Sequence, residues 1–232
     1  MTYVLVHGAT FAGSCWDLML PHLPCAVVAV DLPGRGSRPA DLMQVTVRDF
    51  VDAVVDEIER RDLHDVVLVG HSLAGITLPG VAARIPERLA RLVFVAATVP
   101  EHGQSVLEAL DVATQAVAAE SMSGEHVDPP ADWARAAFCN DMDDELTSWT
   151  LAHMGPEASG VMVEPVDLSG LDTAVPRTWI LTLHDAVVDV ERQRLYAERT
   201  GADVVELDAA HMAMISRPEL LASLLGSLAG AR

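Results

Sequence analysis

The sequence predicts an α/β fold, in which a mostly parallel β-sheet carries helices on both faces. Short apolar runs alternate with longer segments of helical periodicity, and turn residues separate them. The chain has 232 residues, 50% of them hydrophobic, which is enough to bury one core rather than two. The alternation lapses between residues 100 and 172. We therefore expect one domain, with residues 1–99 and 173–232 as its core and residues 100–172 as an inserted helical cap.

The N-terminal part of the core begins with alternating elements and a tight turn. In chain order these are a strand at Tyr3–Val6, a helix at Trp16–Leu23, a strand at Ala26–Val30 and a turn at Asp31–Gly36. Another helix follows, because the Thr46 side chain can cap its first turn and Asp49 stands three residues further on. Phe50, Val54 and Ile58 then recur at helical spacing, which predicts one buried face.

The remaining core elements continue the same alternation. A buried strand at Val66–Gly70 leads into a helix at Leu73–Arg84 and a strand at Leu92–Val95. Beyond the cap we expect a strand, a helix, a strand and a closing helix at Arg177–Leu183, Val190–Arg199, Asp203–Leu207 and Pro218–Leu228. Ligands bind in the loops at the carboxyl edge of a parallel sheet, so candidate functional residues are sought there.

A serine stands where the Val66–Gly70 strand ends, flanked by small residues. Gly70 precedes Ser72 by two positions and Ala74 follows it by two. A tight strand-to-helix turn forces its central residue into a strained conformation and requires small neighbours at these positions. The pattern is therefore that of a nucleophile elbow, which exposes the serine hydroxyl above the sheet. Five residues alone are weak evidence, because similar patterns occur by chance.

Two nucleotide-binding interpretations of the glycine-rich segments fail. Gly70 and Gly75 bracket four residues as in a phosphate-binding loop, but the position of its lysine is Ile76. The chain contains no lysine at all, since its 15 basic residues are all arginine. The Gly34–Gly36 segment lacks the third glycine of a dinucleotide fingerprint. ATP and NAD are therefore poor candidate ligands.

An elbow serine needs a general base and an acid that orients it. His211 follows the last predicted strand and precedes the closing helix, where a mobile loop can present an imidazole to Ser72. Asp185 lies at the end of the preceding strand, which gives the chain order serine, aspartate, histidine. His184 is the rival base, and Asp189 is a less favoured acid.

Two backbone N–H groups are candidates for stabilising an oxyanion. Leu73 follows the predicted nucleophile at a helix N-terminus, where the helix dipole also favours negative charge. Ala9 belongs to the His-Gly turn after the first strand, and that turn lets the backbone approach the site closely. The pairing of these two donors is typical of acyl transfer.

The composition of the cap predicts an apolar pocket that disfavours free anions. Arg135 is its single Lys or Arg residue, against 15 carboxylates from Glu101 through Asp172. Its large apolar side chains are candidates to line the pocket, although most of them can equally pack the cap onto the sheet: Met122, Trp133, Phe138, Met142, Trp149, Met154 and Met162. Gly8, Thr10 and Met212 are the candidate substrate contacts from the core.

Charge and composition exclude several other classes of protein. A net charge of −19 repels phosphate backbones, so we expect no nucleic-acid partner. We see no apolar run long enough to span a membrane and no leader at the N-terminus, and we expect a cytoplasmic location. Cys15, Cys25 and Cys139 suggest reduced thiols, with no metal site. Arginine in place of every lysine is typical of a GC-rich bacterial genome.

The order of these motifs resembles that of the α/β-hydrolase superfamily, and in particular its branch of small methylesterases and hydroxynitrile lyases. The resemblance runs from end to end of the chain and thins in the cap. It is carried by Val4–Ala9 with Trp16, the Asp31–Gly34 turn, Gly70–Ser72, Asp185, and His211–Met214 before Pro218. Departures from the family pattern are Ala74 in place of a glycine and Asp189 where a proline often follows the acid.

The resemblance implies a catalytic triad of Ser72, Asp185 and His211, with Ala9 and Leu73 as oxyanion donors and no cofactor. Lyases of this branch carry a threonine at the position of Gly8 and a lysine directly after the catalytic histidine. Met212 occupies that second position here, so a cation that would stabilise departing cyanide is missing. Hydrolysis is therefore favoured over lyase chemistry.

The sequence thus predicts a serine hydrolase that cleaves a neutral, apolar or aromatic carboxylic ester by two-step acyl transfer. The alternatives with the same triad are a thioesterase, a lactonase, or an enzyme that cleaves an activated carbon–carbon bond. A different class, a ligand-binding or scaffolding protein with vestigial catalysis, is less favoured because the triad is complete. We expect a small-molecule substrate, and the sequence does not indicate an oligomeric state.

Overall fold

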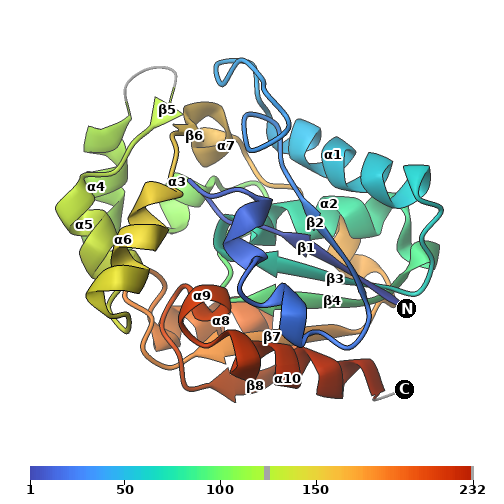
Figure 1. Ribbon diagram of the computed structural model, residues 1–232. Coiled ribbons are helices and arrows are strands. Elements are labelled where there is room, and N and C mark those ends of the chain that lie inside the picture. Colours follow the sequence, from blue (N-terminus) through green and yellow to red (C-terminus); the bar gives the residue numbers. More distant parts are fainter. Residues whose placement is uncertain (123–125, 231–232) are drawn as a thin grey trace.

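A six-stranded parallel sheet forms the centre of the molecule (Figure 1). The computed structural model describes residues 1–122 and 126–230. In the order in which they neighbour one another, the strands are β2 (Ala26–Val30), β1 (Thr2–Val6), β3 (Val66–His71), β4 (Leu89–Val95), β7 (Arg177–Thr182) and β8 (Asp203–Leu207). Every pair in this sheet is parallel. The predicted α/β fold is confirmed.

Both faces of the sheet are buried, which explains the continuous apolar strands. Successive side chains of a strand point to opposite faces, so β1 contributes Val4 and Val6 to one hydrophobic cluster and Tyr3 and Leu5 to the other. The Tyr3 hydroxyl reaches the far side of its cluster and donates a hydrogen bond to the carbonyl of Leu225 at 2.8 Å. The strands therefore have little freedom to shift their register.

Helices cover the two faces much as the periodicity predicts. One cluster contains residues of α1 (Val47–Arg60), α2 (Thr77–Arg84) and α8 (Val190–Thr200), and the other contains residues of α9 (Ala213–Ser216) and α10 (Pro218–Gly230). Thr46 and Asp49 form the predicted capping box at the start of α1. No helix among the described residues has both the length and the apolar character needed to cross a membrane.

Two helix predictions need correction. The segment Trp16–Leu23 is not a helix, since it holds two 3₁₀ turns, η1 (Gly13–Trp16) and η2 (Leu20–His22). Pro21 lacks the N–H that a continuous helix would need, and packing of the fully buried Trp16 holds the segment against the sheet instead. The helix expected from Leu73 starts as the 3₁₀ turn η3 (Ser72–Ile76), so α2 itself begins at Thr77.

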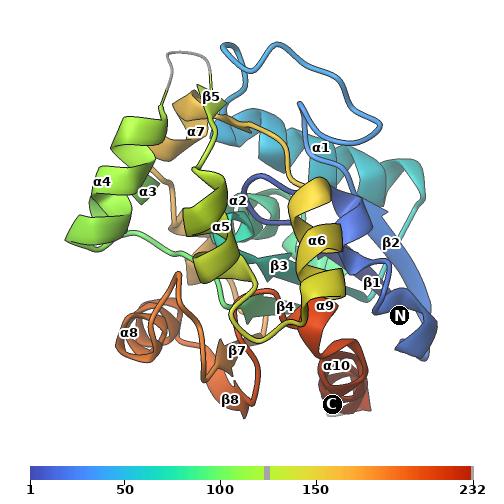
Figure 2. The same cartoon turned by 60° about the vertical axis from the view of Figure 1, so that its left-hand side comes forward.

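We keep the name cap for residues 100–172, whose internal structure was not predicted. In chain order the described part of the cap contains α3 (Val106–Ala109), α4 (Val112–Ser121), β5 (His126–Val127), α5 (Ala131–Phe138), α6 (Asp144–Ala152), β6 (Glu157–Ala158), α7 (Ser159–Val163) and η5 (Ser169–Asp172). Strands β5 and β6 pair antiparallel. Helices α4, α5 and α6 lie together beside one end of the sheet, and Figure 2 brings them forward.

Candidate active site

The turn after β3 holds Ser72 in a conformation that few residues other than glycine adopt. Its φ is +51°, in the left-handed region. The small neighbours are required by space, because a Cβ on Gly70 would lie 2.4 Å from Leu78 Cδ1 and 3.1 Å from the Cβ of Ala74. The Thr98 N–H donates to the Ser72 carbonyl at 2.9 Å and ties the turn to the segment after β4. The packing therefore stabilises the strained turn.

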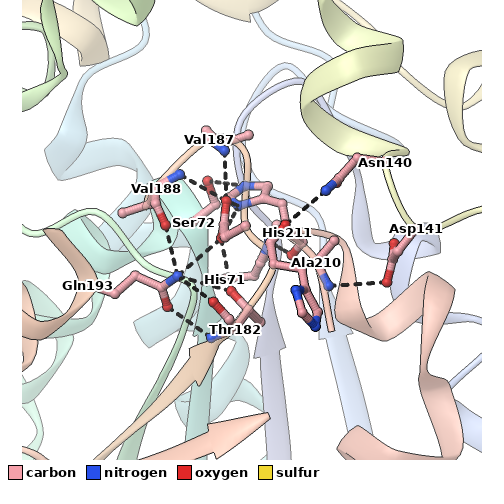
Figure 3. Close-up of polar contacts among 12 residues, drawn as sticks. His71, Ser72, Asn140, Asp141, Thr182, Val187, Val188, Gln193, Ala210 and His211 are labelled. Carbon is pink, nitrogen blue, oxygen red and sulfur yellow. Dashed lines mark hydrogen bonds and ion pairs between the residues drawn. The ribbon is translucent and has the colours of Figure 1, made fainter. Parts of the chain in front are cut away.

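Ser72, His211 and Asp185 lie in one hydrogen-bonded chain. The Ser72 Oγ is 3.0 Å from His211 Nε2, and His211 Nδ1 is 2.8 Å from Asp185 Oδ2 and 3.0 Å from Oδ1 (Figure 3). The side chains of His211 and Asp185 are buried. Serine, imidazole and carboxylate thus have the connectivity that activates a serine nucleophile.

The rival residues lie elsewhere. The exposed His184 side chain pairs with the Asp208 carboxylate at 2.7 Å. Asp189 caps α8, because its side chain accepts a hydrogen bond from the Arg192 N–H. Neither residue is in hydrogen-bond contact with Ser72 or His211 among the described interactions. The structure therefore brings His211 and Asp185 together with Ser72, as the sequence analysis favours, and places His184 and Asp189 in other contacts.

The buried Asp185 carboxylate has several donors besides His211. The N–H groups of Val187 and Val188 each donate to Oδ1 at 2.8 Å, and the Thr182 hydroxyl donates to Oδ2 at 2.9 Å. The side-chain amide of Gln193 adds a longer contact to Oδ2 at 3.4 Å. Because a buried charge is costly without partners, these donors stabilise the ionised carboxylate.

Gln193 is a residue that the sequence analysis missed. Its fully buried side chain extends from α8 and donates to the carbonyls of Thr182 at 3.1 Å and Val188 at 2.8 Å. Its carbonyl oxygen accepts from the Thr182 N–H at 3.1 Å. One side chain therefore holds both ends of the loop that carries Asp185 (Figure 3). The sequence did carry one signal for it: a glutamine on the buried face of a predicted helix must have hydrogen-bond partners nearby.

The cap contacts the loop that carries His211. Asp141, in the connection between α5 and α6, accepts hydrogen bonds from the Ala210 N–H at 3.1 Å and the Ser216 hydroxyl at 2.8 Å. The neighbouring Asn140 amide donates to the carbonyl of His184 at 2.8 Å. Figure 3 shows these contacts on the side of His211 away from Gln193. Asp141 and Asn140 were also missed, since their partners lie far away in the sequence.

Two further histidines are buried near the site. The ring of His71 lies 4.7 Å from that of His211 between centroids, and its Nε2 is 3.0 Å from the His211 carbonyl. Burial and the neighbouring His211 hold the pKa of His71 well below its usual range. His7 lies between the Gly8 carbonyl and the Leu32 N–H, and burial lowers its pKa to about 4. Both rings are therefore neutral near pH 7. His7 donates to the Gly8 carbonyl and accepts from the Leu32 N–H, and His71 donates to the His211 carbonyl.

A pocket opens above Ser72, between the sheet and the cap. Its empty volume is about 740 Å³, with open solvent at the mouth included. Ala9 and Leu73 line it together with Ser72 and His211, so the residues of the two expected oxyanion donors border the same space as the serine. Its walls are mostly apolar, and the described lining residues include no arginine.

The predicted substrate contacts divide into two groups. Those that line the pocket are Thr10, Trp133, Phe138 and Met212, and Met162 of the cap joins them. Gly8 and Trp149 are not among the lining residues. A Cβ on Gly8 would lie 2.8 Å from the Cβ of Ser72, so Gly8 allows the two turns to approach. Trp149 stacks on His153 with ring centroids 3.9 Å apart.

The other cap methionines pack against the hydrophobic clusters. Met122 lies against one cluster, and Met142 and Met154 lie against the other. These three methionines therefore pack the cap onto the core, which is the alternative that the sequence left open, and they do not line the pocket.

The described residues offer no arrangement of three or more His, Cys, Asp or Glu side chains that suits a metal ion. Cys15, Cys25 and Cys139 are unpaired thiols. Burial raises the pKa of the Cys15 and Cys139 thiols, which opposes formation of a reactive thiolate. Ser72, by contrast, lines the pocket and is in hydrogen-bond contact with His211.

The chain is similar in sequence to known hydrolases along most of its length. The sequence matches the alpha/beta hydrolase family over residues 3–224. It is 33% identical to a carbendazim hydrolyzing esterase from Nocardioides sp. (strain SG-4G), over 97% of this chain and 98% of the relative. Methylesterase 7 of Arabidopsis thaliana is 30% identical, over 98% of this chain and 95% of the relative.

The fold is shared with a solved α/β-hydrolase from a Paenibacillus species, described as extracellular and as homologous to tobacco salicylic acid binding protein 2. That structure superposes with a TM-score of 0.90 at 23% identity and covers the whole of both chains. By sequence and by fold, the chain belongs to the alpha/beta hydrolase family and to its methylesterase-like branch.

Proposed function

We propose that this protein is a serine hydrolase that cleaves neutral carboxylic esters with an apolar or aromatic group. The observation that carries the proposal is the Ser72–His211–Asp185 chain at the base of an apolar pocket. The names of its relatives support the reaction class, since they include a carbendazim hydrolyzing esterase, a methylesterase and a pyrethroid hydrolase.

In the proposed reaction, the Ser72 Oγ attacks the ester carbonyl carbon while His211 Nε2 takes the serine proton. Asp185 holds the ring through Nδ1 and stabilises the imidazolium. The carbonyl electron pair moves to the oxygen, which the N–H groups of Ala9 and Leu73 stabilise. When the tetrahedral adduct collapses, His211 returns the proton to the leaving alcohol. Water then attacks the acyl-serine by the same sequence and releases the acid.

The walls of the pocket favour a neutral substrate. The described lining residues include no arginine to bind a carboxylate, and the Glu157 carboxylate, which is among them, pairs with Arg35. The cap as a whole is strongly acidic in sequence. Apolar side chains from α4, α5 and the Ala9–Phe11 segment enclose the remaining space. An uncharged acyl or alkyl group therefore loses less hydration on entry than an anionic one.

Residues at two positions argue against cyanide elimination. A threonine side chain at Gly8 would collide with Ser72, as the 2.8 Å contact of its Cβ shows. Met212 is fully buried and lines the pocket, so no cation stands beside His211 at this position. Thioesters, lactones and activated carbon–carbon bonds use the same nucleophile, and substrate trials separate them from esters.

Labelling with a fluorophosphonate probe tests the nucleophile. We expect the wild type to form one covalent adduct, visible by intact mass spectrometry, and Ser72→Ala to form none. Ser148→Ala is the matched control, because Ser148 is an exposed serine on α6 and its variant should label like the wild type. Equal labelling of wild type and Ser72→Ala would contradict the catalytic proposal and favour a binding protein.

A substrate panel tests the reaction class and the preference for neutral groups. It contains short and long nitrophenyl esters, an aromatic methyl ester, a thioester, a lactone, a compound with an activated carbon–carbon bond, and a carboxylate-bearing analogue of the best ester. We expect kcat/KM for the neutral ester to exceed that for its anionic analogue about tenfold or more, with a smaller ratio at high salt. Inert esters alongside cleavage of a carbon–carbon bond would overturn the esterase proposal.

A further inference from the structure

The cap holds the backbone of the loop that carries Ala9, and a buried carboxylate makes the contact. We propose that Glu157 of β6 is a positioning residue for the oxyanion hole, so that the cap is part of the catalytic machinery and more than a cover for the pocket. This inference rests on the proposed function, since it assigns to Glu157 the orientation of an oxyanion donor.

The contacts are made on both sides of Thr10, the residue after Ala9. The Thr10 N–H donates to Glu157 Oε2 at 3.1 Å, and the Thr10 carbonyl accepts from the Gly155 N–H at 2.7 Å. Both partners belong to the cap. Because the N–H of Thr10 belongs to the peptide that follows Ala9, fixing it restrains the dihedral angles of Ala9 itself. The direction of the Ala9 N–H therefore depends on the cap.

The loop needs this restraint because Thr10 is strained. Its φ is +63°, in the left-handed region that a β-branched residue enters only when its surroundings impose it. Without the two hydrogen bonds from the cap, Thr10 would relax toward negative φ and turn the preceding peptide. A strained residue next to an expected oxyanion donor fits a loop that is preorganised for catalysis.

Glu157 itself is held by a buried ion pair. It is 2% exposed, and its Oε1 lies 2.5 Å from Arg35 Nη2 and accepts the Ala158 N–H at 2.8 Å. Arg35 is 5% exposed and belongs to the turn after β2, where its Nη1 donates to the Gly34 carbonyl at 3.1 Å. The pair thus joins the turn after β2, the loop after β1 and the cap at one point, and its charges balance.

A carboxylate suits this position better than an amide does. Oε1 forms the ion pair with Arg35 and accepts a hydrogen bond from the Ala158 N–H, while Oε2 accepts from the Thr10 N–H. Glutamine has one acceptor oxygen and one donor group. If that oxygen stays toward Arg35 and the Ala158 N–H, which keeps two of the three contacts, Glu157→Gln turns its NH2 toward the Thr10 N–H and loses the loop contact. Arg35→Met breaks the same ion pair but leaves the acceptor for Thr10 in place. The two variants therefore separate loss of the ion pair from loss of the loop contact.

The test uses a trifluoromethyl ketone analogue of an ester that the wild type cleaves. The Ser72 Oγ adds to the ketone carbon, its proton passes to His211, and the carbonyl electron pair becomes an oxyanion in the hole. For Glu157→Gln we expect kcat and the affinity for this ketone to fall about tenfold or more, with KM changed less than about threefold. For Arg35→Met, which keeps the acceptor for Thr10, we expect the thermal midpoint to fall as far as it does in Glu157→Gln, with smaller losses of kcat and ketone affinity than in Glu157→Gln.

A double variant guards against misfolding. Arg35→Met combined with Glu157→Met replaces the pair with apolar side chains. The double variant therefore leaves no unpaired buried charge, and it also lacks the acceptor for Thr10. It should fold and show the same loss of kcat and ketone affinity as Glu157→Gln. Full kcat and ketone affinity in either Glu157 variant would overturn the inference, as would equal losses in Arg35→Met. A wild type that the fluorophosphonate does not label would contradict the proposed function instead.

Discussion

At the scale of single residues, the site depends on a carboxylate that is kept out of water. The Asp185 side chain is fully buried, and its hydrogen-bond partners replace the water that an exposed carboxylate would have. Among the described interactions Gln193 makes no hydrogen bond to His211, but it holds the carbonyls of Thr182 and Val188 at both ends of the loop that carries Asp185. The position of Asp185 therefore depends on a side chain of α8.

Gln193→Leu tests this dependence. We expect the variant to lose about 1–3 kcal/mol of unfolding free energy, because the polar groups of Thr182 and Val188 lose buried partners. We also expect kcat/KM to fall about tenfold, since Asp185 would hold the His211 ring less well. Urea unfolding followed by circular dichroism and ester hydrolysis at pH 7 measure the two effects.

Gln44→Leu is the matched control, because Gln44 is exposed in the segment before α1 and should tolerate the change in both assays. A Gln193→Leu variant that loses stability but hydrolyses the ester at the wild-type rate would show that α8 supports the fold and not the position of Asp185.

The sequence indicated the candidate residues that have strong local patterns, but not the buried residues that hold them in position. Ser72 stands in a small-residue turn, and Asp185 and His211 follow successive strands, so local sequence and chain order were enough to bring them together as candidates. Gln193 and Glu157 carry no such pattern. Their partners lie on other elements and are fixed only by tertiary packing, which a single sequence does not specify.

At the scale of elements, the strands and helices of the core could be predicted from the sequence, whereas those of the cap could not. Core strands are apolar runs between turns, and their positions were predicted to within a few residues. Helix α4 has no buried residue, so its sequence lacks the apolar stripe that identifies an amphipathic helix. The segment Trp16–Leu23 has apolar residues at helical spacing but turns at Pro21, and there the periodicity was misleading.

The connection between α5 and α6 orders the loop that carries His211. Asp141 accepts hydrogen bonds from Ala210 and Ser216, on the two sides of the histidine. We expect Asp141→Ala to lower kcat about tenfold with little change in KM, because the base loses its fixed position while the pocket walls remain. Steady-state kinetics on the best ester of the panel measure both constants.

Asp144→Asn serves as the control for Asp141→Ala, because the Asp144 side chain is fully exposed at the start of α6. It should leave kcat and KM at their wild-type values. If Asp141→Ala raised KM and kept kcat, the connection would shape the pocket and would not hold the base.

At the scale of the whole molecule, the sheet acts as a platform that is buried on both faces and presents its loops at one edge. This burial also encloses His7 and His71, which lie at the carboxyl ends of β1 and β3. Burial favours the neutral form of both rings, so the folded state binds protons less readily than the unfolded chain. The stability of the entire fold is thereby linked to pH.

The sign of this link follows from the lowered pKa values. His7 has a pKa of about 4 in the folded state against about 6.5 when unfolded. Its contribution to the free energy of unfolding is therefore fully present above pH 6.5 and is lost as the pH falls toward 4. Between pH 7 and pH 5 this amounts to about 2 kcal/mol of unfolding free energy. His71 acts in the same direction. Asp31 also has a lowered pKa, but carboxylates with lowered values titrate at more acid pH.

Urea unfolding at pH 7 and pH 5 tests the link, with His7→Asn as the variant. Asparagine keeps a donor near the Gly8 carbonyl and does not titrate, so the variant should be less stable at pH 7 yet lose about 2 kcal/mol less than the wild type on acidification. His22→Asn changes an exposed histidine and should lose as much stability as the wild type does. Equal acid losses in wild type and His7→Asn would mean that His7 takes up its proton without unfolding, and the buried neutral ring would not explain the pH dependence.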